Sequence, residues 1–311
     1  MPEQVELISG PGCPVCVTQV GFIDEAIYLA LERQVTICTF GDLVRVPGTN
    51  MSLAGARERG AKIRIVYSPV DAKEYAKEHP KEQVTFLSVG FETTTPSACL
   101  SVKKAREEGL TNYSILTANK TMPQAYEALK GSADIFLYPG HVNAITGTKP
   151  CEELAKEGVS GVVAGFTAKE LLTALAVALA RFQEGRPFFV NCYPRVVTEN
   201  GSPQAQKLVE EMMEPCDSEW RGLGVIKGSG MRLQEEWSAF DARKKYKIPP
   251  IQGKANPACR CGDVLQGKCK PSDCKVFGKV CTPQHPIGAC MVSGEGACSA
   301  YYMYGEAEKM K

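Results

Sequence analysis

The sequence predicts an α/β protein: two doubly wound parallel-sheet domains around a cleft, followed by a small C-terminal domain rich in cysteine. Three observations support this prediction. Short apolar runs alternate with helical patterns through most of the 311 residues, the connections between them are short, and half of the 14 cysteines lie near the C-terminus. Strand–helix alternation with short loops is typical of parallel sheets that are covered by helices.

The alternation can be followed along the chain. The predicted strands are 5–8, 35–40, 63–67, 84–89, 113–118, 134–138, 159–164, 188–190 and 224–226. The predicted helices are 22–31, 52–59, 71–78, 96–108, 123–130, 167–182 and 204–213. So many strands favour two α/β domains over one large sheet. We expect these domains at 1–90 and 91–228, with a soft boundary across which the chain can return, and the C-terminal domain at 229–311.

Composition and charge exclude several classes of protein. The apolar fraction of 44% is that of an ordinary globular protein, and a net charge of +1 does not indicate nucleic-acid binding. The longest apolar stretch, 171–180, is shorter than the roughly 20 residues that span a bilayer. The opening Met-Pro-Glu-Gln has no features of a secretory signal. We therefore expect a cytoplasmic protein without nucleic-acid or membrane partners, in which clustered cysteines bind metal or carry out redox chemistry.

Cys13 and Cys16 form a Cys-x-x-Cys pair between the predicted strand 5–8 and the predicted helix 22–31. Unpaired N–H groups and the dipole at a helix N-terminus stabilise a thiolate and lower the thiol pKa. The two intervening residues allow a reversible disulfide. Two packed or metal-binding cysteines are the structural alternative, but the strand–turn–helix context favours redox-active or ligand-binding thiols.

Glu92, Thr93 and Thr94 lie in the loop Gly-Phe-Glu-Thr-Thr-Thr-Pro that ends the predicted strand 84–89. Thr95 is the expected N-cap of the next helix, and Pro96 suits its first turn. Simple capping is the structural alternative. Because capping needs only one hydroxyl, the additional threonines and the carboxylate favour a binding loop.

His141 lies in a third loop, Pro-Gly-His-Val-Asn-Ala-Ile-Thr-Gly, which follows the predicted strand 134–138. A single histidine after a strand is often structural, and here a role in proton handling is an equal alternative. Each of the three loops follows the carboxyl end of a predicted parallel strand, where α/β sheets bind ligands. Two facing domains would bring them to one cleft, whose groups suit a soft metal ion with small anionic ligands or a thiol-exchange reaction. Nucleotide binding is not supported, because the Gly-rich phosphate motifs are missing.

The C-terminal cysteines are separated by Gly, Pro and Lys, so hydrophobic contact alone cannot order this segment. They are Cys259, Cys261, Cys269, Cys274, Cys281, Cys290 and Cys298. Disulfides, zinc or an iron–sulfur cluster could bind the sulfurs. Zinc sites usually show paired Cys-x-x-Cys spacings and many ferredoxins a repeated one, and neither pattern occurs in this segment. The residues alone indicate a metal site, with a cluster slightly favoured, and do not select four ligands among the seven.

Together the motifs resemble the HypD family of hydrogenase maturation factors. The matching stretches are 10–16 (Gly-Pro-Gly-Cys-Pro-Val-Cys), 90–96 (Gly-Phe-Glu-Thr-Thr-Thr-Pro), 139–142 (Pro-Gly-His-Val), 281–283 (Cys-Thr-Pro) and 288–293 (Gly-Ala-Cys-Met-Val-Ser). They occur in the right order over essentially the whole chain, so the resemblance is specific. It implies two similar α/β domains around a cleft and a small C-terminal iron–sulfur domain.

The resemblance also implies a [4Fe-4S] cluster held by cysteines that are separated by fourteen, six and sixteen residues. The cysteines with this spacing here are Cys259, Cys274, Cys281 and Cys298. Cys261, Cys269 and Cys290 are secondary candidates, either redox-active or simply buried. Family members carry a further Cys-Gly-Gly-His-Thr segment, whose cysteine helps to hold iron. The sequence starts after that segment, and whether iron is held without it is left open.

The function that the resemblance implies is maturation of [NiFe]-hydrogenase. The chain would be a scaffold on which a transient Fe(CN)2CO unit is assembled with a small HypC-type chaperone and a HypE-type cyanide donor. The cluster would relay electrons to or from a redox-active dithiol, and polar loop residues would orient the diatomic ligands or move protons. The candidate residues for these roles are Cys13, Cys16, Glu92, Thr93, Thr94 and His141. The alternatives are a cluster-dependent thiol–disulfide oxidoreductase acting on a partner protein, and a zinc-stabilised binding module without a redox role.

Overall fold

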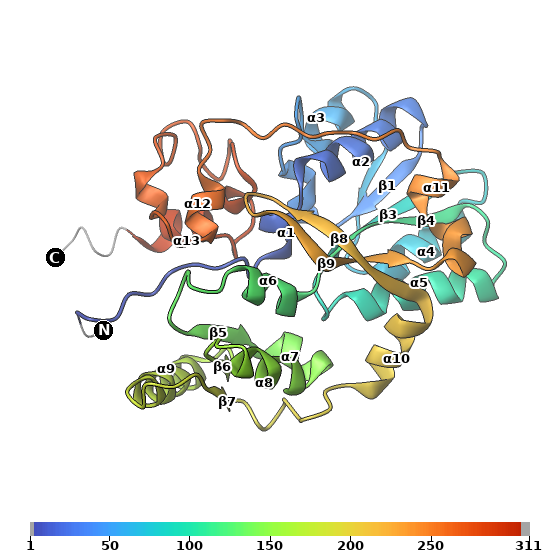
Figure 1. The fold of residues 1–311 in the computed structure, drawn as a ribbon. Coiled ribbons are helices and arrows are strands. Elements are labelled where there is room, and N and C mark those ends of the chain that lie inside the picture. Colours follow the sequence, from blue (N-terminus) through green and yellow to red (C-terminus); the bar gives the residue numbers. More distant parts are fainter. Residues whose placement is uncertain (1–2, 306–311) are drawn as a thin grey trace.

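The computed structural model describes residues 3–305 and shows an α/β molecule with two parallel sheets and one antiparallel ribbon (Figure 1). The strands are β1 (Thr36–Thr39), β2 (Ile63–Ile65), β3 (Val84–Gly90), β4 (Tyr113–Asn119), β5 (Phe136–Pro139), β6 (Gly161–Ala164), β7 (Phe189–Asn191), β8 (Met213–Trp220) and β9 (Gly224–Leu233). β1 to β4 form one sheet, β5 to β7 form a second, and β8 pairs with β9. The predicted α/β class with more than one parallel sheet is confirmed.

Helices follow the strands in alternation. Up to the ribbon they are α1 (Pro14–Val17), α2 (Val20–Glu32), η1 (Gly41–Arg45), α3 (Leu53–Glu58), α4 (Pro69–Glu78), α5 (Thr95–Glu107), α6 (Met122–Ala128), α7 (Gly140–Thr146), α8 (Lys149–Lys156), α9 (Ala168–Phe182) and α10 (Pro203–Met212). The predicted capping box of α9 is present: the Glu170 N–H donates to the Thr167 hydroxyl at 3.3 Å, and the Glu170 carboxylate accepts from the Thr167 N–H at 3.1 Å. Capping satisfies backbone donors that the first helical turn leaves unpaired.

The four-stranded sheet has the order β2-β1-β3-β4 and is covered on both faces. Ile37 and Leu87 pack in one core with α2 and α3, whereas the adjacent Cys38 and Phe86 pack in another core with α4 and α5. Successive side chains of a strand point to opposite faces, so each buried strand contributes to both cores. This explains why β1, β3 and β4 are buried at every position rather than at alternate positions.

The three-stranded sheet, in the order β5-β6-β7, is built in the same way. Val162 of β6 packs with α9, and the next residue, Val163, packs in a larger core that includes Leu154 of α8. α10 then leads the chain away from this sheet and into the ribbon (Figure 1).

The β8–β9 ribbon returns the chain to the first sheet. Thr18 forms an antiparallel bridge with Trp220 of β8, and Lys120 forms one with Gly230 of β9. Met213 and Leu233, which face each other across the ribbon, join the core beneath α4 and α5. The ribbon therefore contacts both the Cys13–Cys16 segment and the end of β4.

After the ribbon, η2 (Glu235–Phe240) and α11 (Ala242–Lys245) pack beside the first sheet, and the chain then crosses its helices toward the C-terminal cysteines (Figure 1). Gly21 and Gly253 pack so closely that a Cβ on Gly253 would lie 2.2 Å from the Gly21 nitrogen. The cysteine-rich segment contains only short helices: α12 (Cys261–Leu265), η3 (Pro271–Asp273), η4 (Ala289–Met291) and α13 (Ala297–Tyr304). Between residues 3 and 305, none of the helices combines the length and the apolar character that a membrane crossing requires.

One predicted strand was wrong, and one strand of the structure was missed. No strand forms at 5–8, where Leu7 and Ile8 are exposed and pair with no neighbouring strand. β8 was not predicted, because Met-Glu-Pro-Cys-Asp-Ser-Glu-Trp is mostly polar and acquires its strand conformation from pairing with β9. The predicted domain boundaries stay predictions. The predicted boundary between residues 90 and 91 separates β3 from β4, and these two strands pair along their whole length in one sheet.

Candidate functional site

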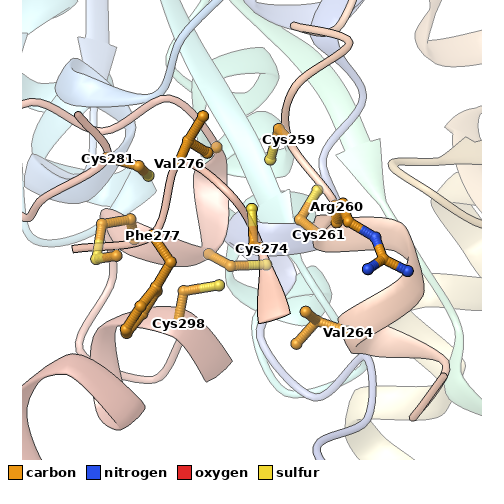
Figure 2. A pocket seen from close by; sticks show the side chains of 12 residues that line it. Cys259, Arg260, Cys261, Val264, Cys274, Val276, Phe277, Cys281 and Cys298 are labelled. Carbon is orange, nitrogen blue, oxygen red and sulfur yellow. The ribbon is translucent and has the colours of Figure 1, made fainter. Parts of the chain in front are cut away.

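Six of the seven C-terminal cysteines line one pocket, which we call the cysteine pocket (Figure 2). Its cysteines are Cys259, Cys261, Cys274, Cys281, Cys290 and Cys298. The remaining lining is mainly apolar and includes Val264, Phe277 and Met291, while Arg260 is its one charged residue. Cys269 is the cysteine of this segment that does not line the pocket. The fold thus gathers sulfurs that are widely spaced in the sequence.

The four predicted cluster ligands all belong to this set, and the backbone is shaped around them. The Ile287 N–H donates to the Cys281 sulfur at 3.3 Å. Gly288 lies against Cys259, and a Cβ at position 288 would be 2.5 Å from the Cys259 sulfur. Donated N–H groups stabilise negative charge on sulfur, and only a residue without a side chain leaves this sulfur its space.

These residues fit an iron–sulfur cluster by their chemistry. The donors around the pocket are thiols, with no carboxylate or imidazole among the lining residues. Within residues 3–305, no three His, Cys, Asp or Glu side chains are close enough to hold a single metal ion. A zinc site needs four donors on one ion. A [4Fe-4S] cluster binds one thiolate on each of its four irons, so its four ligands lie farther apart than the ligands of a single metal ion.

Cys13 and Cys16 lie on α1, a single helical turn that precedes α2. Cys13 is the N-cap, and its sulfur accepts the Cys16 N–H at 3.4 Å. Both side chains are buried, with Cys16 completely inaccessible to solvent. Contact with Cys16 lowers the pKa of Cys13, and contact with Cys13 raises that of Cys16. The pair therefore has the expected helix N-terminal position, although the preceding segment is an exposed coil instead of a strand.

Five cysteines, which we call the thiol series, lie within or against one hydrophobic core. Its members are Cys13, Cys16, Cys290, Cys261 and Cys259. Cys290 and Cys261 also line the cysteine pocket, so this core joins the Cys13–Cys16 pair to the pocket. The neighbouring Cys16 raises the pKa of the Cys290 thiol, and burial adds to this effect. Because Cys16 lowers the pKa of Cys13, negative charge within the Cys13–Cys16 pair is best held at Cys13.

Glu92 begins the second loop and carries a buried carboxyl group. One oxygen accepts the Met122 N–H at 2.9 Å, and the other has no hydrogen-bond partner in the part of the chain that the structure describes. Burial raises the pKa of Glu92 to about 7. Among residues 3–305, the buried hydroxyls of Tyr126 and Tyr138 also have no hydrogen-bond partner, and their rings lie 4.6 Å apart between centroids. Sequence reasoning missed both tyrosines, because aromatic residues on a helix and a strand are usually part of the core.

The neighbouring threonines divide their roles. Thr94, and not the expected Thr95, is the N-cap of α5. The Thr94 and Thr95 hydroxyls both donate to the Phe91 carbonyl, at 3.3 and 2.9 Å, so they stabilise the loop itself. Thr93 is exposed. Of the three hydroxyls, that of Thr93 is the one most open to a ligand.

His141 lies in the first turn of α7, so the predicted loop at 139–147 is mostly helical. Its side chain is exposed and stacks on Phe166, with ring centroids 4.2 Å apart. Residues next to the three predicted motifs meet in one hydrophobic core: Val17 follows Cys16, Phe91 precedes Glu92, and Val142 follows His141. The structure thus packs the three segments on a common core and leaves His141 itself on the surface.

Comparison with known proteins places the chain among close relatives. A family model described as "HypD: Hydrogenase formation hypA family" matches residues 1–305. The protein named "Hydrogenase maturation factor HypD" of Cupriavidus necator is 42% identical over 318 residues, which cover 98% of this chain and 84% of the relative. The protein of the same name from Escherichia coli K12 is 42% identical over 316 residues, covering 99% and 84%. That of Rhizobium leguminosarum bv. viciae is 43% identical over 318 residues, covering 98% and 83%.

Proposed function

The chain belongs to the HypD family of hydrogenase maturation factors, and from this premise we infer how it serves the maturation of [NiFe]-hydrogenase. We propose that it is a scaffold on which the Fe(CN)2CO unit is assembled as cargo. A small HypC-type chaperone and a HypE-type cyanide donor would be its partners. The observation that supports the proposal is the common hydrophobic core in which Cys13 and Cys16 pack with Cys261 and Cys290 of the cysteine pocket.

Cys259, Cys274, Cys281 and Cys298 are the proposed ligands of a [4Fe-4S] cluster, because all four line one thiol-rich pocket. Such a cluster supplies or accepts one electron at a time when it is bound. The chain's own part is to hold the sulfurs, to donate N–H groups to them and to keep carboxylates out of the pocket wall.

Cys13 and Cys16 are the proposed redox-active dithiol. Their oxidation to a disulfide releases two electrons and two protons. Cys13 is the thiol of this pair that loses its proton more readily, since Cys16 lowers its pKa. Cys290 and Cys261 share a core with this pair and also line the pocket, so they provide thiols for exchange with the pocket.

Glu92, Thr93, Thr94 and His141 are proposed to orient the diatomic ligands of the cargo or to move protons. A carboxyl group whose pKa is about 7 can both hold and release a proton at neutral pH. The exposed hydroxyl of Thr93 and the exposed imidazole of His141 are free to contact a ligand. The Thr94 hydroxyl is bonded to the Phe91 carbonyl, so its contribution is to fix the shape of the loop.

Three measurements test the proposal. Anaerobic metal analysis should find about four irons and four sulfides per chain with broad visible absorbance, whereas one zinc and no colour would favour a structural module.

Co-purification with the HypC-type partner, followed by infrared spectroscopy, should show bands of metal-bound cyanide and CO. A Cys13→Ser, Cys16→Ser double variant should not support maturation in a host that lacks its own copy. Full maturation by that variant would refute the thiol role, and Cys192→Ser, outside the series, is the control.

A thiol–disulfide oxidoreductase is the second candidate. The pKa of Cys13 is lowered, and Cys13 shares a core with other cysteines that could exchange disulfides with it. This candidate predicts that the protein reduces a disulfide substrate without the HypC-type partner and without cyanide chemistry. Turnover under those conditions, together with the absence of infrared bands in the co-purified complex, would favour this candidate over the scaffold.

A further inference from the structure

Arg221 lies at the tip of the β8–β9 ribbon and is 6% exposed. Its guanidinium group donates to the carbonyl oxygens of Thr18 at 2.7 Å and Pro47 at 3.2 Å, and its backbone N–H donates to Val17 at 2.9 Å. Among the ion pairs of residues 3–305, none involves Arg221. Burying a charge without an opposite charge is costly, so the absence of a carboxylate here requires a physical explanation.

Several thiols lie near this guanidinium. Arg221 lines a cavity of about 200 Å³ together with Cys259, Cys261 and Asp263, and this cavity shares residues with the cysteine pocket. The Asp263 carboxylate pairs with Arg260 at 2.9 Å. Burial lowers the pKa of Arg221, and the groups that oppose this effect are the thiols of Cys261, Cys290, Cys259 and Cys16. The counter-charge that remains for Arg221 is therefore negative charge on these sulfurs or on a cluster that they surround.

The ribbon tip holds Arg221 rigidly against both cysteine regions. Its contacts with Val17 and Thr18 fix it to the residues that directly follow Cys16. On the other side, the adjacent Gly222 packs on Gly262 of α12, where a Cβ on Gly222 would lie 2.3 Å from the Gly262 Cα. A charge fixed in this way acts on the sulfurs without needing to reorganise.

We propose that Arg221 is the counter-charge of the cysteine pocket and raises the reduction potential of a cluster bound there. The inference rests on the cluster of the proposed function. Reduction adds one electron to the cluster, and no bond forms or breaks at Arg221. The added negative charge is stabilised by the nearby guanidinium, so the reduced state is favoured. Arg221 is a positioning and tuning residue and does not ligate iron.

Two other arginines near the cysteines provide contrasts. Arg260 lines the same pockets, but it is exposed and pairs with Asp263 at 2.9 Å, so its charge is balanced. Arg45 donates to the carbonyl oxygens of Pro283 at 2.9 Å and Val292 at 3.1 Å, and thus anchors the same segment from an exposed position. Arg45 is the matched control, because its substitution removes one charge and two carbonyl contacts without removing a buried guanidinium.

The test compares wild-type protein with Arg221→Gln, Arg221→Lys and Arg45→Gln variants after anaerobic reconstitution. Iron and sulfide are counted, folding is followed by circular dichroism, and the cluster is titrated with dithionite as reductant and ferricyanide as oxidant under electron paramagnetic resonance. In Arg221→Gln, the ratio of reduced to oxidised cluster at a fixed potential should fall about tenfold or more, which corresponds to about 59 mV for one electron. Arg221→Lys and Arg45→Gln should stay close to wild type.

The outcomes separate the alternatives. Equal midpoint potentials in wild type and Arg221→Gln would overturn the inference. Loss of the cluster in both Arg221 variants would also overturn it, because the carbonyl contacts and not the charge would then be the role of this residue. Loss in Arg221→Gln with retention in Arg221→Lys supports the counter-charge, since only the charge distinguishes the two in that case. Wild-type protein that binds no cluster would contradict the proposed function instead.

Discussion

Cys16 and Cys290, which lie near opposite ends of the sequence, are buried in a common hydrophobic core. The Cys16 thiol also lies 4.0 Å from the carbonyl oxygen of Ala289, the residue before Cys290. Helix α1 therefore packs directly on η4 of the cysteine-rich segment. This contact is the point at which the two cysteine motifs become one site.

Substitution of Cys290 should separate the two motifs without removing a predicted cluster ligand. In a Cys290→Ser variant, we expect iron and sulfide content to be unchanged. The experiment starts from protein whose Cys13 and Cys16 are joined in a disulfide, and dithionite supplies the two electrons that reduce it. In the variant this reduction should be about tenfold slower or more, which corresponds to an increase of about 1.4 kcal/mol in the barrier. The measurement is thiol alkylation followed by mass spectrometry. Cys269→Ser, in the same segment but away from the pocket, is the control, and equal rates in all three proteins would exclude a relay through Cys290.

Glu92 should make stability decrease with rising pH. Its pKa is about 7 in the folded protein against an ordinary value of 4.5, so between these values the unfolded carboxyl group loses a proton that the folded one keeps. The free energy of unfolding should therefore fall by up to about 3 kcal/mol from pH 4.5 to pH 7, at about 1.4 kcal/mol per pH unit. Chemical denaturation across this range should show that Glu92→Gln removes this component. Exposed Glu127→Gln should not, and a parallel loss in both variants would refute the assignment.

Lys120 should act in the opposite direction at higher pH. Its amine is buried, donates to the Ser218 hydroxyl and the Glu219 carbonyl, both at 2.7 Å, and has a pKa lowered to about 7 by burial. Above pH 7 the folded amine is neutral while the unfolded amine, with an ordinary value of 10.5, stays charged. The free energy of unfolding should therefore rise with pH in the wild-type protein relative to Lys120→Met. The measurement is made below pH 9, so that ionisation of the cysteine thiols does not contribute. Exposed Lys227→Met on the same ribbon should reproduce the wild-type slope.

Gly288 should be required by the cysteine pocket. A Cβ at this position would lie 2.5 Å from the Cys259 sulfur, which forces the sulfur or the backbone to move. We expect Gly288→Ala to lower the free energy of unfolding by about 1–3 kcal/mol, the usual cost of overpacking, and to reduce the iron content after reconstitution. Gly294→Ala is the matched control, because a Cβ there meets no atom within 4 Å. Identical iron content and stability in the two variants would show that the pocket tolerates a side chain.

Much of the fold could be predicted from the sequence, because β1, β3, β4 and β6 are buried along their whole length and helices such as α4 and α9 begin with capping boxes. The seven strands of the parallel sheets, β1 to β7, were all predicted to within a few residues. The errors concern segments whose conformation depends on distant partners. The 5–8 run is apolar but finds no strand to pair with, and the polar β8 is a strand only because β9 lies beside it.

The site was predictable in part. The position of Cys13 and Cys16 at a helix start follows from local pattern, and it was found there. One pocket is lined by Cys259, Cys274, Cys281 and Cys298, and this arrangement could not be derived from their spacing in the sequence. Short helices and turns without periodicity determine where these four side chains lie. Their role as ligands stays a prediction, as do the roles of the polar loops. Arg221 was missed, since nothing in the sequence of the ribbon tip indicates that it will share a cavity with Cys259 and Cys261.

The packing of α1 on η4 has a consequence for how the protein is made. Synthesis proceeds from the N-terminus, so Cys13 and Cys16 leave the ribosome long before Ala289 and Cys290, which cover them. Until Ala289 and Cys290 have been translated, the early thiols stay uncovered and open to oxidants. Newly made molecules therefore depend on a reducing environment until nearly the whole chain has been made.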